Sequence, residues 1–158
     1  MNREKIKRVK VAFIGEGNVG KTTLANALAN EVGDVKMTIG VDIHVLNSKE
    51  LSMIIFDLSG QERFQFLRDF VLKNAKLVCY IFDVSEPATL YSLLNYPVVI
   101  SHKILVGNKI DLGMKVKENE VKVVANYLEA NKIFYTSAIR YYGVKELLTY
   151  MLKVVRTL

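Results

Sequence analysis

The chain has 158 residues, of which 51% are apolar and 24% are charged. This length and composition exclude a disordered protein and predict one folded domain, residues 1–158, with a sizeable core. No apolar run approaches the ~20 residues of a membrane-spanning helix, and the start lacks the pattern of a secretory signal, so we expect a cytoplasmic protein. The single cysteine, Cys79, lies in an apolar run, which excludes a disulfide framework and favours a place in the core.

The formal net charge is +6, and five of the first ten residues are basic. Such a cluster suits an anionic membrane surface or nucleic acid, but we favour a solvated terminus. No aromatic residue interleaves with these charges, as single-strand binding requires, and we expect no DNA partner. Because no cysteine follows Cys79, we also expect no direct lipid anchor near the C-terminus.

Strand and helix patterns alternate along the chain. Short apolar runs predict strands, and apolar residues spaced by three and four predict helices. In chain order we expect strands or helices at 9–14 (strand), about 22–30 (helix), 41–46 and 51–56 (strands), 77–84 (strand), around 87–94 (short helix), 103–108 (strand), near 118–130 (helix), 133–136 (strand), and a final helix with Val144, Leu147, Leu148, Met151 and Val155 on one face.

The alternation of strands and helices predicts the layers of the fold. Strand-helix units build a parallel sheet that is covered by helices on both faces. The polar turn at 47–50 instead predicts a hairpin between the second and third strands. We therefore expect a three-layer α/β/α fold with a mostly parallel six-stranded sheet and one antiparallel edge strand.

The stretch GEGNVGKT at 15–22 lies between the first strand and the first helix and satisfies the pattern G-x-x-x-x-G-K-[ST]. Glycines allow backbone N–H groups to converge on an anion at the positive end of a helix dipole. A polyphosphate suits this loop, with Lys21 spanning the β- and γ-phosphates and the Thr22 hydroxyl binding Mg²⁺. The alternative is a glycine-rich turn with an unrelated lysine. We expect nucleotide contacts from Gly15, Gly17, Asn18, Val19, Gly20, Lys21, Thr22 and Thr23.

The stretch VGNKID at 106–111 follows another predicted parallel strand, at the sheet edge where ligands of open α/β folds bind. The Asp111 carboxylate offers two acceptors for the N1–H and 2-amino donors of guanine, a pair that adenine lacks. Asn108 is placed to join this loop to the phosphate loop, and the Lys109 stem to cover one face of the base. An ordinary Asn-Lys turn is the alternative, and the glycine-rich loop upstream makes guanine the favoured interpretation.

A third polar stretch, DLSGQERF at 57–64, follows the second hairpin strand. We expect Asp57 to reach the Mg²⁺ shell, the Gly60 N–H to reach the γ-phosphate, and Gln61 to orient the attacking water.

Five motifs in order, GEGNVGKT, TIGVD, DLSGQERF, GNKID and TSA, resemble the Ras superfamily of small GTPases over almost the whole chain. TIGVD and GQERF are most similar to its Rab-like branch. The resemblance implies a P-loop NTPase G domain that binds GTP and GDP with Mg²⁺, acts as a molecular switch and hydrolyses GTP slowly.

The resemblance also implies roles for individual residues. Thr38 would bind Mg²⁺ through its hydroxyl, so that Thr22, Thr38 and Asp57 would be the metal ligands and Gln61, Lys21 and Thr38 the catalytic group. Residues 32–41 and 57–71 would be the two switch segments, which bind an effector, an exchange factor and a GTPase-activating protein. The Ser137 and Ala138 backbone would face guanine O6. Gly17 would leave room for Gln61 and for a partner's arginine, and we expect a monomer.

Departures from the family pattern carry their own expectations. No aromatic residue occurs in 24–40, where the family places one against the base, and Ile139 stands where it often has lysine, so we expect looser guanine binding and faster GDP release. No arginine occurs between residues 9 and 62, which predicts intrinsic hydrolysis on the order of 10⁻⁴ to 10⁻² s⁻¹ until an activator supplies one.

Other functions stay open on the sequence alone. A GTP-binding module that signals by occupancy would not need Gln61 and Gly17. A P-loop kinase of a small metabolite would need an arginine-rich lid in place of the NKID loop. A ribosome-associated GTPase fits the basic charge, although no additional RNA-binding domain is visible.

Overall fold

The computed structural model describes residues 6–32, 35–36, 43–48, 51–58, 70–100 and 102–157. Strands and helices alternate through most of this range. The elements in chain order are β1 (Lys7–Ile14), α1 (Lys21–Val32), β2 (Val35–Lys36), β3 (Ile43–Asn47), β4 (Leu51–Leu58), β5 (Ala75–Asp83), α3 (Pro87–Ser92), the 3₁₀ turn η1 (Leu93–Asn95), β6 (Lys103–Asn108), the 3₁₀ turn η2 (Ile110–Leu112), α4 (Glu118–Leu128), β7 (Lys132–Tyr135) and α5 (Val144–Arg156).

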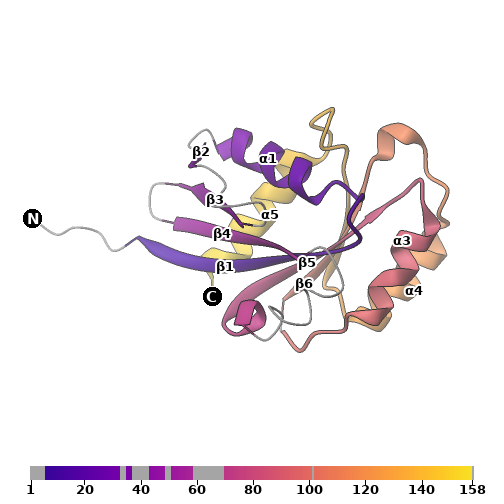
Figure 1. Cartoon of the computed structure of the whole chain (residues 1–158), viewed down its shortest axis with the longest axis horizontal. Helices are drawn as coiled ribbons and strands as arrows, with labels where there is room; N and C mark the ends of the chain where they lie inside the picture. Colours follow the sequence, from indigo (N-terminus) through magenta and orange to yellow (C-terminus); the bar gives the residue numbers. More distant parts are fainter. Residues whose placement is uncertain are drawn as a thin grey trace, which may run out of the picture.

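One sheet runs through the molecule in the order β2-β3-β4-β1-β5-β6-β7. Strands β4, β1, β5, β6 and β7 are parallel neighbours, and β3 runs antiparallel to β4. The predicted α/β fold, with a mostly parallel sheet and an antiparallel hairpin, is confirmed (Figure 1). Beyond the six predicted strands, the two-residue β2 pairs with β3 and adds a short seventh strand at that edge.

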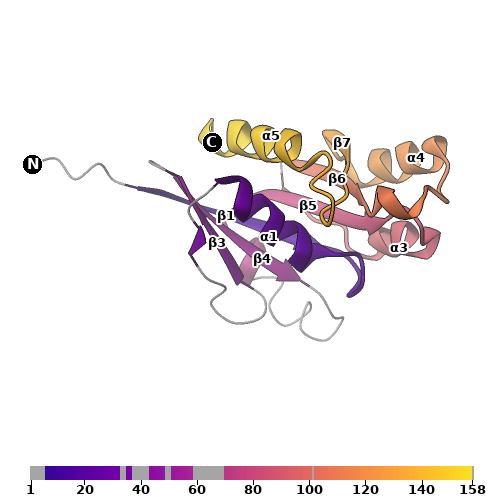
Figure 2. The same ribbon diagram turned by 90° about the horizontal axis from the view of Figure 1, so that it is seen from above.

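Two separate apolar cores lie on the two faces of the sheet. Successive residues of β1 point to opposite faces, so Val11 and Phe13 pack with α1 and α5, whereas Ala12 and Ile14 pack with α3 and α4. Figures 1 and 2 show these two helix pairs covering the sheet as outer layers. Because β5 and β6 are covered on both faces, their sequences are almost continuously apolar, as parallel strands in the middle of such a fold usually are.

The last helix shows how the sequence places an element on this sheet. In α5 the buried side chains recur at helical spacing, and the basic residues Lys153 and Arg156 lie in the last turn, where they interact favourably with the helix dipole. Its buried face is formed by Val144, Leu147, Leu148, Met151, Val154 and Val155.

Two further expectations concern single features of the chain. Cys79 lies in β5 and is buried, as predicted, and burial raises the pKa of its thiol. No helix among the described residues combines the length and the apolar character needed to span a membrane.

Candidate functional site

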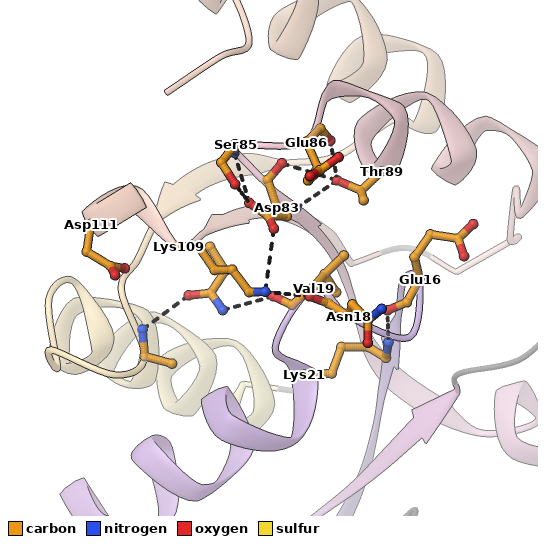
Figure 3. A network of polar contacts seen from close by, with 12 residues as sticks. Glu16, Asn18, Val19, Lys21, Asp83, Ser85, Glu86, Thr89, Lys109 and Asp111 are labelled. Atoms are coloured by element: carbon orange, nitrogen blue, oxygen red, sulfur yellow. Dashed lines mark hydrogen bonds and ion pairs between the residues drawn. The ribbon is translucent and has the colours of Figure 1, made fainter. Parts of the chain in front are cut away.

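Polar side chains gather where the parallel strands β1, β4, β5 and β6 end. The loop 15–20 follows β1, Asp57 lies near the end of β4, Asp83 ends β5, and Asn108 ends β6. Figure 3 shows the contacts that join three of these strand ends. Ligands of open α/β sheets bind at this edge, so the topology brings together motifs that are up to about ninety residues apart in sequence.

Lys21 is a buried cation at the first position of α1. Its side chain is 2% exposed, and its ammonium donates to the carbonyl oxygens of Gly15 (2.8 Å) and Glu16. The Asp57 carboxylate lies 3.8 Å away. Burial lowers the pKa of Lys21, and the charges of Asp57 and Glu16 act in the opposite direction. A cation held this way, with little water around it, interacts strongly with an anion that enters the loop.

The hydroxyl of Thr22 donates a hydrogen bond to Oδ2 of Asp57 at 3.0 Å. This contact joins the start of α1 to the end of β4, so two of the three predicted metal ligands lie side by side. Hydroxyl and carboxylate oxygens are the ligands that Mg²⁺ prefers, and its protein sites often use only one or two such side chains. The donor set therefore fits Mg²⁺, although no cluster of three or more His, Cys, Asp or Glu residues occurs among the described residues.

Two glycines allow the loop 15–20 to pass close to neighbouring segments. A Cβ at Gly15 would clash with the carbonyl oxygen of Ile81 in β5. Gly20 has φ of +92°, and a Cβ there would lie 2.6 Å from the Asn108 amide nitrogen. Directly after this turn, the first N–H groups of α1 have no acceptor within the helix and lie at its positive end. The backbone N–H donors at the start of α1 and the positive end of its dipole therefore lie next to the loop 15–20, where an anion could bind.

Asn108 connects three segments through one buried amide. Its Nδ2 donates to the carbonyl of Val19 at 3.0 Å, while its Oδ1 accepts from the Thr136 hydroxyl at 2.9 Å and from the Ala138 N–H at 3.1 Å. The phosphate-loop candidate, the end of β6 and the loop after β7 are therefore held at fixed distances from one another.

Lys109 makes a second connection to the same loop. Its backbone is left-handed, with φ of +66°, and its ammonium donates to the carbonyl of Asn18 at 2.6 Å. The Asp83 carboxylate pairs with it at 3.5 Å and also accepts from the N–H and the hydroxyl of Ser85 (Figure 3). The Lys109 ammonium is thus held by two partners, so its side chain spans from the residue after β6 to the loop 15–20.

Asp111 lies in the exposed turn η2, where Oδ1 accepts a hydrogen bond from the Ser137 hydroxyl at 2.7 Å. Ser137 and Ala138 are buried, whereas Ile139 is 71% exposed. The structure therefore brings two predicted base-binding segments together, and Ile139 stands out from them toward solvent.

Several predicted site residues lie outside the described residues. They are Thr38, Gly60 and Gln61, together with most of the two predicted switch segments, 32–41 and 57–71. At the end of the second segment, Val71 is buried while Phe70 is 69% exposed. The Lys10 ammonium of β1 lies 5.1 Å from the centre of the Phe70 ring.

Two residues of this network, Asp83 and Thr136, were not predicted to take part in the site. Asp83 orients Lys109, and Thr136 orients Asn108. Position was a signal for both, because each is a polar residue at or next to the end of a predicted buried strand, and Thr136 is also the first residue of the TSA motif.

The fold and this site define a class: a P-loop nucleotide-binding protein, with a glycine-rich loop, a lysine and a threonine between β1 and α1 of a mainly parallel sheet. Comparison with protein families matches residues 10–157 to the Ras family. The chain belongs to the Ras family and is a Rab-like small GTPase.

Individual relatives include an uncharacterized protein and two proteins named as ras-related. The chain is 31% identical over 146 residues to the uncharacterized protein MJ1339 of Methanocaldococcus jannaschii, covering 89% of this chain and 92% of that protein. It is 30% identical to the putative ras-related protein Rab-5B of Dictyostelium discoideum, over 94% of this chain and 76% of that protein. The ras-related protein Rab-7B of the same organism is 33% identical, over 66% of this chain and 59% of that protein.

Proposed function

We propose that this small GTPase is a guanine-specific, Mg²⁺-dependent switch that hydrolyses GTP to GDP slowly. The observation that carries the proposal is a pair of hydrogen bonds between the candidate base-binding segment 108–111 and the candidate phosphate loop 15–20. Asn108 donates to the Val19 carbonyl, and Lys109 donates to the Asn18 carbonyl. These contacts hold a candidate base-binding loop beside a candidate phosphate loop, at the strand ends where one nucleotide would reach both.

The described side chains support distinct roles toward such a nucleotide. Lys21 is a desolvated cation that would contact the β- and γ-phosphates, and the first N–H groups of α1 would contact the same anion. Asp111 has a second carboxylate oxygen beyond the one that Ser137 contacts, and the two oxygens match the donor pair of guanine. Thr22 and Asp57 would hold Mg²⁺, which neutralises developing phosphate charge when bound.

Catalysis in this proposal is positioning and charge stabilisation, with no covalent intermediate. Gln61 would orient the attacking water, the backbone and hydroxyl of Thr38 would contact the γ-phosphate and Mg²⁺, and Gly17 would leave space for Gln61. A Cβ at Gly17 would meet no atom within 4 Å among the described residues, which is consistent with a position reserved for an incoming group.

The identity of the bound nucleotide can be tested directly. The purified protein is denatured and the released nucleotide identified, and calorimetry with Mg²⁺ compares GDP, GTP and ATP. We expect guanine nucleotide in the supernatant and tight binding of GDP and GTP alone. Equal affinity for ATP, or no binding of any of the three, would contradict the proposal.

The remaining proposals concern partners and exchange. Residues 32–41 and 57–71 would contact an effector, an exchange factor and an activating protein in the cytoplasm, with the chain itself monomeric. Capture of proteins by the GDP form and by a non-hydrolysable GTP form identifies partners that sense the γ-phosphate. We also expect faster GDP release than in relatives, and a GDP half-life of many hours with Mg²⁺ would contradict that expectation.

A further inference from the structure

The loop 137–142, which follows β7, is closed on itself. The N–H of Ser137 donates to the carbonyl of Tyr142 and the N–H of Tyr142 to the carbonyl of Ser137, both at 3.0 Å. Helix α5 begins directly afterwards, behind Gly143, whose φ is +70°. This loop carries Ser137 and Ala138, which contact Asp111 and Asn108. Its position therefore determines how the base-binding segments face one another.

Tyr141 in this loop has an unusual backbone and a long-range contact. Its φ is +58°, a left-handed conformation that residues other than glycine, asparagine and aspartate seldom adopt. Its hydroxyl accepts a hydrogen bond of 2.6 Å from the amide of Asn30, which is 111 positions away in the sequence. Conformations of this kind persist where the surroundings hold them, and Asn30 supplies such a contact.

Asn30 lies near the end of α1, the helix that starts at Lys21. The two candidate base-binding segments, 108–111 and 137–142, are therefore attached near opposite ends of α1. At the start, Asn108 binds the Val19 carbonyl, and at the far end, Asn30 binds Tyr141. The predicted first switch segment, 32–41, begins two residues after Asn30, so this second attachment joins the loop 137–142 to the helix end from which that segment departs.

We propose that Tyr141 is a positioning residue for guanine nucleotide, and that its hydrogen bond to Asn30 holds the loop 137–142 on α1 and slows nucleotide release. The inference rests on the proposed guanine-specific function. Without the bond, the loop is free to shift relative to α1, and Ser137 no longer holds the Asp111 carboxylate in one orientation. Release then becomes faster, and discrimination at the 2-amino group, which Asp111 would bind, becomes weaker.

The test is a double-mutant cycle that measures release of a fluorescent GDP analogue with Mg²⁺ in wild-type protein, Tyr141→Phe, Asn30→Ala and the double variant. Each single substitution removes one solvent-exposed hydrogen bond and is expected to speed release about two- to tenfold. Because both remove the same bond, the double variant should release GDP no faster than the faster single variant. Tyr142→Phe is the matched control, since Tyr142 is a neighbouring exposed tyrosine, and its release rate should equal that of wild type.

A second readout separates positioning from general destabilisation. Inosine diphosphate lacks the 2-amino group, so the ratio of its release rate to that of GDP reports contact with Asp111. This ratio should fall in Tyr141→Phe and stay at the wild-type value in Tyr142→Phe. Unchanged GDP release in Tyr141→Phe, or effects of the two single variants that multiply in the double variant, would overturn the inference. Failure of the wild-type protein to bind GDP would instead show that the underlying guanine function is wrong.

Discussion

Asp111 illustrates how much of one side chain's bonding capacity the protein itself uses. An ionised carboxylate has about four acceptor positions on its two oxygens. Ser137 occupies one of them, on Oδ1, and thereby fixes the orientation of the plane. The remaining positions suffice for the two parallel donors on the Watson–Crick edge of guanine, so orientation by Ser137 and recognition of the base are compatible.

Replacing this carboxylate by an amide should change the preferred base. In Asp111→Asn one acceptor becomes a donor and meets the 2-amino donor of guanine, so GDP affinity should fall by about 10²-fold, since hydrogen bonds to charged groups are worth about 1.5–3 kcal/mol each. Xanthine has a carbonyl at that position, and xanthosine diphosphate should bind the variant better than GDP does. Calorimetry with both nucleotides measures this, with Glu146→Gln, a change at an exposed side chain of α5, as the control. Retained preference for GDP would contradict the role of Asp111.

Gln61 should separate turnover from binding. In Gln61→Leu the side chain keeps a similar size but loses the groups that are proposed to orient water, so GTP hydrolysis should slow about 10- to 100-fold while GTP affinity stays within about twofold of wild type. Single-turnover phosphate release and calorimetry measure the two quantities separately. Unchanged hydrolysis in this variant would refute the role assigned to Gln61.

The sequence predicted some residues of the site and not others for a physical reason. Asn108, Lys109 and Asp111 are adjacent to one another, so a short pattern identifies them. Asp83 at the end of β5 and Thr136 directly after β7 act on those residues from neighbouring parts of the sheet, and no local pattern encodes which strands become neighbours. Their roles follow only from the β5-β6-β7 order of the sheet.

Among the elements, the loop before α1 is held closely by its neighbours. Its two constrained glycines lie next to β5 and next to Asn108 at the end of β6. The loop shape therefore depends on close packing against the sheet as well as on its own backbone preferences. Gly17 between them is unconstrained by the described residues, which makes it a natural control for the effect of an added methyl group.

Two alanine substitutions should separate packing from chemistry in this loop. Gly15→Ala forces the added methyl group against the Ile81 carbonyl and should lower the free energy of unfolding by about 1–3 kcal/mol, with weaker GDP binding. Gly17→Ala should change both quantities little and should slow hydrolysis, because its methyl group enters the space proposed for Gln61. Urea unfolding, calorimetry and single-turnover hydrolysis measure these effects. Equal stability of Gly15→Ala and wild type would contradict the packing argument.

The elements differ in how far the sequence predicted them. Strand β6 was predicted at its observed bounds, since a continuous apolar run ends there at a polar residue. The helix expected around 87–94 is instead α3 followed by the turn η1. Strand β2 was not predicted, because two residues carry no periodic pattern and pair only through β3.

At the scale of the whole molecule, the site draws on both halves of the sheet. Lys21 and Asp57 belong to the side of β1 and β4, whereas Asn108 and Asp111 belong to β6 and the turn after it. A nucleotide that contacts both sets would bridge these halves. Binding would then raise the free energy of unfolding of the protein, because a ligand that binds only the native state stabilises that state by mass action.

This coupling predicts that nucleotide binding raises Tm, and that the increase depends on both the phosphate loop 15–20 and the base-binding segment 108–111. GDP with Mg²⁺ at 100 times its Kd should stabilise the protein by about 2.7 kcal/mol and raise Tm by about 5–11 °C, on a scale of about 2–4 °C per kcal/mol for a domain of this size. The shift should shrink when EDTA removes Mg²⁺, because the ion that Thr22 and Asp57 would hold is then absent from the proposed site. It should also shrink in Asp111→Asn at the same GDP concentration, since guanine is held less tightly. Calorimetric scans of wild-type protein and Asp111→Asn measure these shifts in Tm. An equal shift with ATP would show that the protein does not discriminate between guanine and adenine. A shift that EDTA does not change would contradict the proposed Mg²⁺ site.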